Sequence, residues 1–242
     1  MPSREWNAAS YDRQSDPQLA MARDVIDRLD LHGDERVLDA GCGTGRVTEV
    51  LKARVPDGHV VAVDGSANMV QEARARGLDA HTQDLTELTL DEPVDAILST
   101  ATFHWIADHD RLFARLHQAL KPHGRLAAQC GGAGNIANVQ AAIDEVDHPA
   151  LRGWPGPWHY ATPEATRERL AAAGFTDVWT WLQPWPVDPP DPREYFTTVI
   201  LGSHLERIPH EEREPFVDAV LRHLDHPVRA NYVRLNLLAR RS

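Results

Sequence analysis

The chain has 242 residues, a formal net charge of −11 at pH 7 and two cysteines. The acidic excess argues against a nucleic-acid partner, because phosphates would be repelled and no basic stripe compensates. Two cysteines cannot form a disulfide framework, the N-terminus lacks an apolar signal region, and no run approaches the roughly 18 apolar residues of a membrane span. We therefore expect one cytoplasmic domain over residues 1–242, a monomer or homodimer that contacts neither nucleic acid nor membrane.

Apolar runs alternate with helical patterns along the chain, which predicts an α/β fold with helices on both faces of a parallel sheet. Helices are expected at 18–30 and 110–120, where apolar residues recur at helical spacing. Strands are expected at 36–40, 59–63, 78–82, 94–99, 124–129, 175–183 and 230–239. The pattern predicts a Rossmann-like, doubly wound, mostly parallel seven-stranded sheet whose last strand lies antiparallel beside the fifth.

Two stretches exceed what such a sheet needs, residues 131–174 and residues 184–227. Both leave the carboxyl side of the sheet, where ligands of open α/β folds bind. We expect them to form a helical cap over a substrate site.

A glycine-rich turn follows the first strand, with Gly41, Gly43 and Gly45 spaced two apart. Glycines allow a sharp turn and close approach to a ligand, and the next helix offers free N–H donors. Asp64 ends the second apolar run, where it can accept hydrogen bonds from ribose hydroxyls. A dinucleotide fingerprint would need glycine where Arg46 stands, which opposes a nicotinamide cofactor.

The arrangement Asp39-x-Gly41-x-Gly43-x-Gly45 resembles motif I of the class I methyltransferases, which use S-adenosylmethionine. The segment Ser99–Asp108, with His104-Trp105 at its centre, resembles the segment after strand four in the trans-aconitate methyltransferase-like, small-molecule branch of that family. Trp6 and Tyr11 look like the family's N-terminal lid, which would place a lid helix region at residues 1–30.

The resemblance implies a set of residues that contact S-adenosylmethionine. Motif I would hold the amino acid end of the cofactor, Asp84 the adenine amino group, and the Leu85 N–H the adenine ring. Asp84 can equally be a helix N-cap, and Met69 can equally fill core space instead of packing on the adenine. The full set is Tyr11, Asp39, Gly41, Gly43, Gly45, Asp64, Gly65, Ser66, Met69, Asp84, Leu85 and Thr100.

His104 is the candidate catalytic residue, because it follows strand four beside the expected methyl group. It can serve as a general base or as a hydrogen-bonding residue that positions the acceptor. We favour positioning, because relatives can carry glutamine at this place and glutamine cannot be a base. The histidines are scattered, and no cluster of histidine and cysteine predicts a metal site.

Aromatic residues gather in the second half of the chain. Trp154, Trp158, His159 and Tyr160, together with Trp105, are candidates for the wall of a substrate pocket. Trp179 and Trp181 share a face of an expected strand and are predicted to be core. The pocket segment has only Arg152 close by, whereas a polycarboxylate is usually held by several arginines. A monocarboxylate, a phenol or a heteroaromatic metabolite therefore stays open.

The leading hypothesis is S-adenosylmethionine-dependent methyl transfer to a small molecule, through O-methylation of a carboxylate or a hydroxyl. Two alternatives remain at this point. One is an NAD(P)-dependent oxidoreductase, which Asp64 permits and Arg46 opposes. The other is a protein that binds S-adenosylmethionine without methylating.

Overall fold

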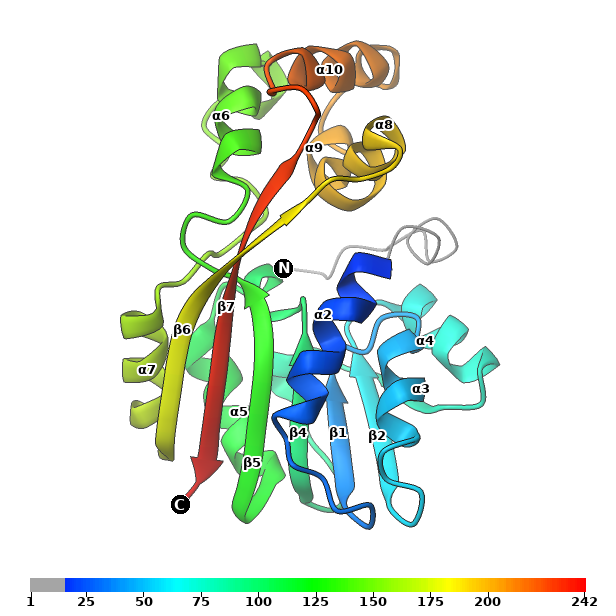
Figure 1. Cartoon of the computed structure of the whole chain (residues 1–242), viewed down its shortest axis with the longest axis vertical. Helices are drawn as coiled ribbons and strands as arrows, with labels where there is room; N and C mark the ends of the chain where they lie inside the picture. The colour runs from blue at the N-terminus through cyan, green and yellow to red at the C-terminus, as the bar shows by residue number, and fades with distance from the viewer. Residues whose placement is uncertain (1–15) are drawn as a thin grey trace.

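The computed structural model describes residues 16–242, with side chains described from Met21 onward. Seven strands form one sheet in the order β3-β2-β1-β4-β5-β7-β6. β1 to β5 run parallel, whereas β7 is antiparallel to both of its neighbours (Figure 1). The strands are β1 Arg36–Ala40, β2 His59–Asp64, β3 Asp79–Thr82, β4 Val94–Thr100, β5 Leu120–Gly131, β6 Phe175–Val187 and β7 Ala230–Arg241. The predicted doubly wound sheet with an antiparallel last strand is confirmed.

Helices cover both faces of the sheet, because its central strands are apolar on both sides. Val25 and Ile26 of α2 pack with Leu51 of α3 over one face. Leu112 of α5 and Leu170 of α7 pack over the other. These body helices are α2 Asp16–Asp27, α3 Arg46–Lys52, α4 Ala67–Ala75, α5 His109–Ala119 and α7 Pro163–Ala172, with short 3-10 turns at Leu85–Glu87 and Phe103–Trp105.

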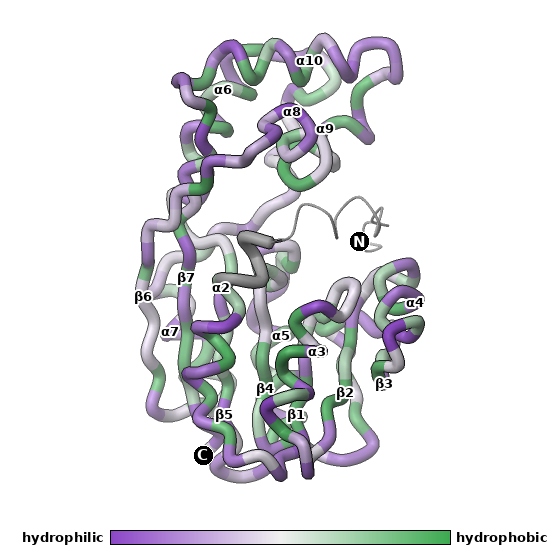
Figure 2. The backbone as a smooth tube through the Cα atoms, turned by 45° about the vertical axis from the view of Figure 1, so that its right-hand side comes forward, coloured by the Kyte–Doolittle hydropathy of each residue, from purple (hydrophilic) through white to green (hydrophobic). Residues whose placement is uncertain are grey.

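A second group of helices lies beyond the carboxyl ends of the parallel strands (Figure 1). β6 and β7 extend past the rest of the sheet and carry it. We call this group the cap; it has a buried apolar core of its own, centred on Phe196, Phe216 and Val220. In Figure 2 the cap helices are polar on their outer sides. The cap comprises α6 Ala137–Val146, the 3-10 turn Pro149–Leu151, α8 Pro192–Tyr195, the π turn Phe196–Ile200, α9 Gly202–Leu205 and α10 His210–Arg222.

The two stretches expected to form a cap differ in where they lie. The stretch 184–227 contributes α8, α9 and α10 to the cap. The stretch 131–174 divides, because α6 joins the cap while α7 packs against β6 and α5 on the body. The start of α2 reaches the cap as well, since Met21 belongs to the cap core.

Trp179 and Trp181 of β6 were predicted to be core residues, and this prediction is wrong. Trp179 is 70% exposed, and Trp181 is half-buried beneath the guanidinium of Arg28, 5.1 Å away. β6 is an edge strand, whereas α2 packs over β4 and β5, so α2 does not cover Trp179.

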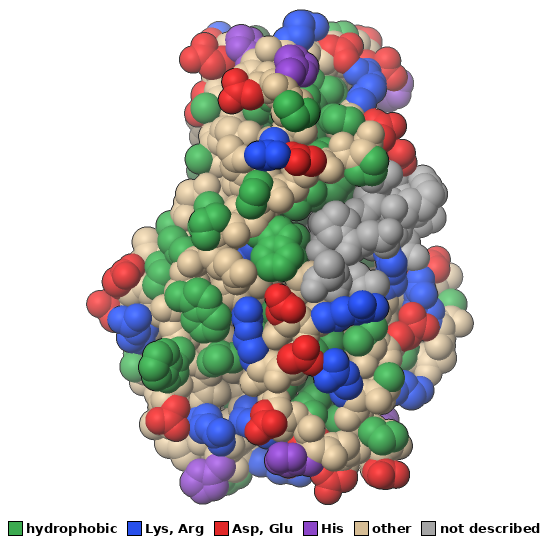
Figure 3. All heavy atoms as spheres, in the orientation of Figure 1, with side chains coloured by type: hydrophobic (Ala, Val, Ile, Leu, Met, Phe, Trp, Pro, Cys, Tyr) green, Lys and Arg blue, Asp and Glu red, His purple; other side chains and the backbone are tan. Residues whose placement is uncertain are grey.

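The surface of the protein is mixed in charge. Acidic and basic side chains are interspersed on the face shown in Figure 3. Within residues 16–242, no helix combines the length and hydrophobicity needed to cross a bilayer.

Candidate active site

The glycine turn after β1 is shaped for two different purposes. Gly41, Gly43 and Gly45 all have positive φ angles, of 92°, 54° and 88°. A Cβ at Gly41 would lie 2.0 Å from Oγ1 of Thr102, and one at Gly45 would lie 2.4 Å from Leu78. A Cβ at Gly43 would meet nothing within 4 Å. Gly41 and Gly45 are therefore required by packing, whereas Gly43 borders open space in which a ligand can approach the backbone.

Asp64 fastens this turn to the end of β2. Its Oδ2 accepts the N–H of Gly43 at 2.9 Å, and its Oδ1 accepts the N–H of Ser66 at 2.8 Å. Gly65 lies between them in the turn that leads into α4. These bonds hold the Asp64 carboxylate at the carboxyl end of β2, where the ribose contact is predicted.

Asp39 is a buried carboxyl group at the base of the turn. It is 1% exposed, and its Oδ2 accepts the hydroxyl of Thr48 at 2.7 Å. Its Oδ1 is enclosed without a hydrogen-bond partner among the described residues. Burial raises the pKa of Asp39 to about 7, Thr48 lowers it, and the charge of Asp64 raises it further. A buried, unpaired carboxylate oxygen suits a cationic group, so these residues fit the ammonium of S-adenosylmethionine.

The other predicted cofactor residues also have structural duties. Oδ1 of Asp84 caps the 3-10 turn that starts at Leu85, accepting both the N–H and the hydroxyl of Thr86 at 2.8 Å. Oγ of Ser66 caps α4 by accepting the N–H of Met69 at 3.4 Å. Ser66, Met69 and Leu85 are buried. The cap at Leu85 uses Oδ1 of Asp84 alone, so its Oδ2 can accept from a ligand.

The turn after β4 is tied to the glycine turn. Oγ1 of Thr102 donates to the carbonyl of Thr100 at 2.9 Å and approaches that of Gly41 at 3.3 Å. Ala101 adopts a φ of 55°, and its N–H donates to the carbonyl of Gln129 in β5 at 2.7 Å. Thr100 itself is the last residue of β4 and is half-buried. These hydrogen bonds fix the turn that comes directly before His104.

His104 is a buried, neutral imidazole. It is 7% exposed, and its Nδ1 accepts the N–H of Gly131 at 3.2 Å. Burial, with the charges of Arg234 and His109, holds its pKa well below the ordinary 6.5. A neutral ring carries one proton, and because Nδ1 accepts, that proton is assigned to Nε2. His104 thus presents a hydrogen-bond donor at Nε2.

Trp105, Trp158 and Tyr160 form an aromatic wall next to His104. Trp158 and Tyr160 are stacked with ring centroids 5.7 Å apart, and Trp105 lies 6.0 Å from Trp158. The His104 ring lies 5.2 Å from Trp105 and 6.0 Å from Tyr160. His159 does not join the wall. Its N–H donates to the carbonyl of His104 at 2.8 Å, but its ring packs on His109 of α5 at 4.6 Å.

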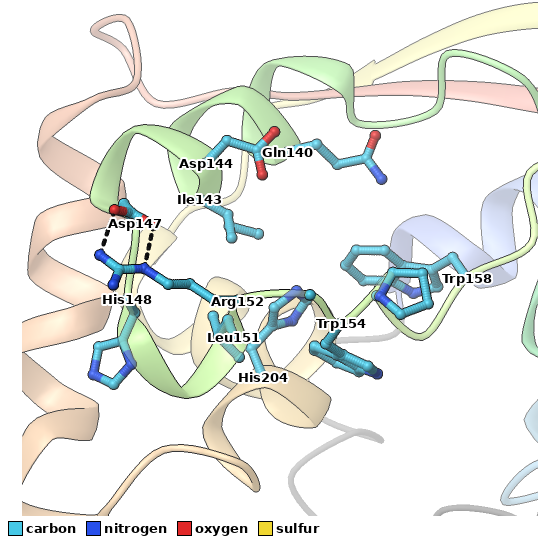
Figure 4. A pocket seen from close by; sticks show the side chains of 13 residues that line it. Gln140, Ile143, Asp144, Asp147, His148, Leu151, Arg152, Trp154, Trp158 and His204 are labelled. Carbon is cyan, nitrogen blue, oxygen red and sulfur yellow. Dashed lines mark hydrogen bonds and ion pairs between the residues drawn. The ribbon is translucent and has the colours of Figure 1, made fainter.

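A cavity of about 640 Å³ lies inside the cap, and Trp158 and Trp154 line it (Figure 4). Trp154 packs on His204 at 5.0 Å, beneath the guanidinium of Arg207 at 4.5 Å. The ion pair between Asp147 and Arg152 lies at the other end (Figure 4). Trp158 belongs to both the cavity and the aromatic wall, so the two are adjacent, but Trp105 and Tyr160 do not line the cavity. The predicted Tyr11, like Trp6, is outside the described residues.

Arg234 is a residue of this region that the sequence analysis did not select. It is 4% exposed, lies on β7 opposite Gly131, and its Nε has no hydrogen-bond partner among the described residues. A signal was present, since Arg234 is the only charged residue in the predicted last strand, 230–239. Among residues 16–242, no three His, Cys, Asp or Glu side chains are grouped to hold a metal ion.

Known proteins resemble this chain in sequence and in fold. The family described as "Methyltransferase domain" matches residues 37–124. Trans-aconitate 2-methyltransferase of Methylobacterium radiotolerans is 31% identical, over 96% of this chain and 94% of the relative. The enzyme of the same name from Paracidovorax citrulli is 29% identical, over 98% and 99%.

Two solved structures share the fold at lower sequence identity. Phosphoethanolamine N-methyltransferase 2 of Haemonchus contortus, in complex with S-adenosyl-L-methionine, matches with a TM-score of 0.66 and 17% identity, over 97% of this chain and 56% of that one. YcgJ of Bacillus subtilis matches with a TM-score of 0.67 and 15% identity, over 92% and 98%.

Proposed function

The chain belongs to the family of class I S-adenosylmethionine-dependent methyltransferases, and we propose from this premise that it methylates a carboxylate oxygen of a small metabolite, giving a methyl ester. The nicotinamide-dependent alternative is not favoured by the family match, by the relatives or by the arginine at position 46. The relatives that span nearly the whole chain are named for trans-aconitate, whose reactive groups are carboxylates.

The observation that carries the proposal is the protonation state of His104. Its Nδ1 is occupied by the N–H of Gly131, and its pKa lies well below 6.5, so at neutral pH it donates from Nε2 and does not act as a base. Burial raises the pKa of Tyr160, and raises that of Cys130 to about 12, so neither is an anionic base near His104. An oxygen acceptor at this site must therefore arrive already ionised. A carboxyl group is ionised at neutral pH, whereas a phenol, with a pKa of about 10, is not.

When bound, S-adenosylmethionine supplies a methyl group that is electrophilic because it is attached to a sulfonium. The chain has to hold the cofactor and the acceptor in line and to exclude water, and such alignment provides most of the rate enhancement. In this proposal the backbone at Gly43 lies against the cofactor, Asp39 meets its ammonium, and Asp64 meets its ribose. Nε2 of His104 donates to the acceptor oxygen and orients it, and the aromatic wall keeps water out. No proton has to move during the transfer, because the carboxylate has none to lose.

The test is an assay with methyl-labelled S-adenosylmethionine and a panel of carboxylic acids, phenols and amines, including trans-aconitate. A methyl ester is hydrolysed by mild alkali and releases labelled methanol, whereas a phenol ether or a methylamine is stable. We expect alkali-labile product from carboxylic acids alone. An alkali-stable product would overturn the carboxylate assignment. Binding of S-adenosylmethionine without transfer to any acceptor would instead favour a non-methylating role.

A further inference from the structure

Arg234 is a buried cation that has no anionic partner among the side chains described from Met21 onward. It is 4% exposed, and no hydrogen bond or ion pair joins its guanidinium to any carboxylate among the described residues. Arg125, at the opposite end of the sheet, has the usual arrangement, because it donates to Glu35 at 2.8 Å. Burying an unpaired charge is costly, so arginine at such a position requires a compensating interaction.

The surroundings of Arg234 do not supply that interaction. Its charge acts on His104, Cys130, Tyr160 and Tyr232, all of which are neutral in their ordinary forms. The Tyr232 ring lies 5.7 Å from the guanidinium carbon, which offers a cation–π contact but no negative charge. Nε of Arg234 is buried and has no hydrogen-bond partner among the described residues. The two Nη atoms are therefore the end of the guanidinium that a ligand can reach.

The position of Arg234 in the sheet puts it on the acceptor side of the site. It pairs with Gly131 across the β5–β7 ladder, and the N–H of Gly131 is the donor that fixes His104. Gly131 also packs against Tyr160, because a Cβ there would lie 2.6 Å from the tyrosine ring. Gly131 of β5 therefore pairs with Arg234, donates to His104 and packs against Tyr160 of the aromatic wall.

We propose that Arg234 is the residue that selects the acceptor, binding a carboxylate of the substrate through its guanidinium fork. A planar guanidinium matches a carboxylate with two parallel hydrogen bonds, and this pairing is strong where water is excluded. Arg234 then supplies the affinity for the anion, while His104 orients the oxygen that receives the methyl group. This inference rests on the proposed function, since it assumes a carboxylate acceptor.

The experiment compares Arg234→Gln and Arg234→Lys with the unaltered protein. Arg28→Gln is the matched control, because Arg28, directly after α2, also contacts β7 but has a partner, donating to Oδ1 of Asn236 at 2.5 Å. For carboxylate acceptors we expect Arg234→Gln to raise KM by about 10- to 100-fold, the range for a lost charged hydrogen bond. Arg234→Lys should be intermediate, and Arg28→Gln should leave KM within about twofold. Affinity for S-adenosylhomocysteine should be unchanged in all three.

Thermal unfolding separates this role from a structural one. Removal of an unpaired buried charge should leave the Tm of Arg234→Gln unchanged or raise it, whereas loss of a structural contact would lower it. A KM unchanged in Arg234→Gln, or a lower Tm accompanied by lost S-adenosylhomocysteine binding, would overturn the proposal for Arg234 while leaving the carboxylate chemistry intact.

The converse failure gives a different result. If the acceptors prove not to be carboxylates, the proposed function fails, but carboxylates should still inhibit competitively in the unaltered protein and lose that inhibition in Arg234→Gln. An absence of turnover, of inhibition and of thermal stabilisation by every carboxylate in the panel would remove both proposals.

Discussion

The two sides of the candidate site are built in different ways. The cofactor side lies within residues 39–102 and is shaped mainly by the backbone, through three glycines with positive φ and loop N–H groups held by Asp64. The acceptor side is shaped by side chains from distant segments, with His104, Tyr160 and Arg234 meeting around Gly131. A short motif can specify the first arrangement, whereas the second exists only after the whole sheet has assembled.

The two sides also differ in charge. Asp39, Asp64 and Asp84 give the cofactor side its carboxyl groups, and the acceptor side carries a neutral His104 and a cationic Arg234. This division matches a cofactor with an ammonium and a sulfonium and an acceptor with a negative charge. Variants on each side should therefore have separable effects.

The largest effect is expected from Gly43→Val, which acts on the cofactor side alone. The new side chain would project into the open space beside the backbone and would occupy the place of the cofactor. We expect affinity for S-adenosylhomocysteine, measured by calorimetry, to fall by more than about 100-fold, or roughly 3 kcal/mol. Gly77→Val is the control, because Gly77 also has a positive φ, 76°, and open space around it. A similar loss of binding in both variants would mean that backbone strain, and not occlusion, is responsible.

Asp39→Asn should have the next largest effect and should change the pH dependence of cofactor binding. Burial keeps the pKa of Asp39 at about 7 in the folded protein, above its ordinary 3.8, so the folded state holds this proton more tightly than the unfolded state. The contribution of Asp39 to stability therefore falls as pH rises from about 4 to about 7. Pairing with an ammonium needs the ionised form, so affinity for S-adenosylhomocysteine should rise between about pH 6 and pH 8.

In Asp39→Asn we expect affinity about tenfold lower above pH 8, with no rise across this interval. Glu35→Gln provides a comparison, because Glu35 is a buried carboxylate just before the opposite end of β1, bound to Arg125. It should alter stability and leave the affinity unchanged. A pH dependence in Asp39→Asn identical to that of the unaltered protein would assign the titration to another group.

The smallest effect is expected from His104→Gln on the acceptor side. Glutamine keeps a donor at this position and removes the titratable ring, so a residue that positions a carboxylate should be replaced with most of kcat retained. The rate profile should show no ionisation near 6.5 in either protein, because the pKa of His104 lies well below that value. A loss of about 100-fold or more with an acceptor that is protonated at neutral pH, such as a phenol, would instead identify His104 as a general base.

Much of the body could be predicted from the sequence, because its signals are local. Apolar runs bounded by charged residues and glycines located every strand, and the glycine spacing distinguished motif I from a dinucleotide loop. The limits of β6, the exposure of Trp179 and the packing of α7 on the body depend on which strand forms the sheet edge, and no local pattern records that. Arg234 was overlooked for the same reason. Its importance comes from its pairing with Gly131 of β5, and this pairing exists only when β7 has joined the sheet.

The placement of β7 has a consequence for the order in which the protein is made. β7 leaves the ribosome after both β5 and β6, yet it lies between them, and the hydrogen bond from Gln129 to Asn236 joins residues 107 apart. The five parallel strands can assemble while translation continues, but β6 has no neighbouring strand in the sheet until β7 appears. A nascent chain that already has its glycine turn therefore lacks the arginine that would select an acceptor. Synthesis of β7 completes the sheet and would supply the proposed acceptor-binding arginine in the same step.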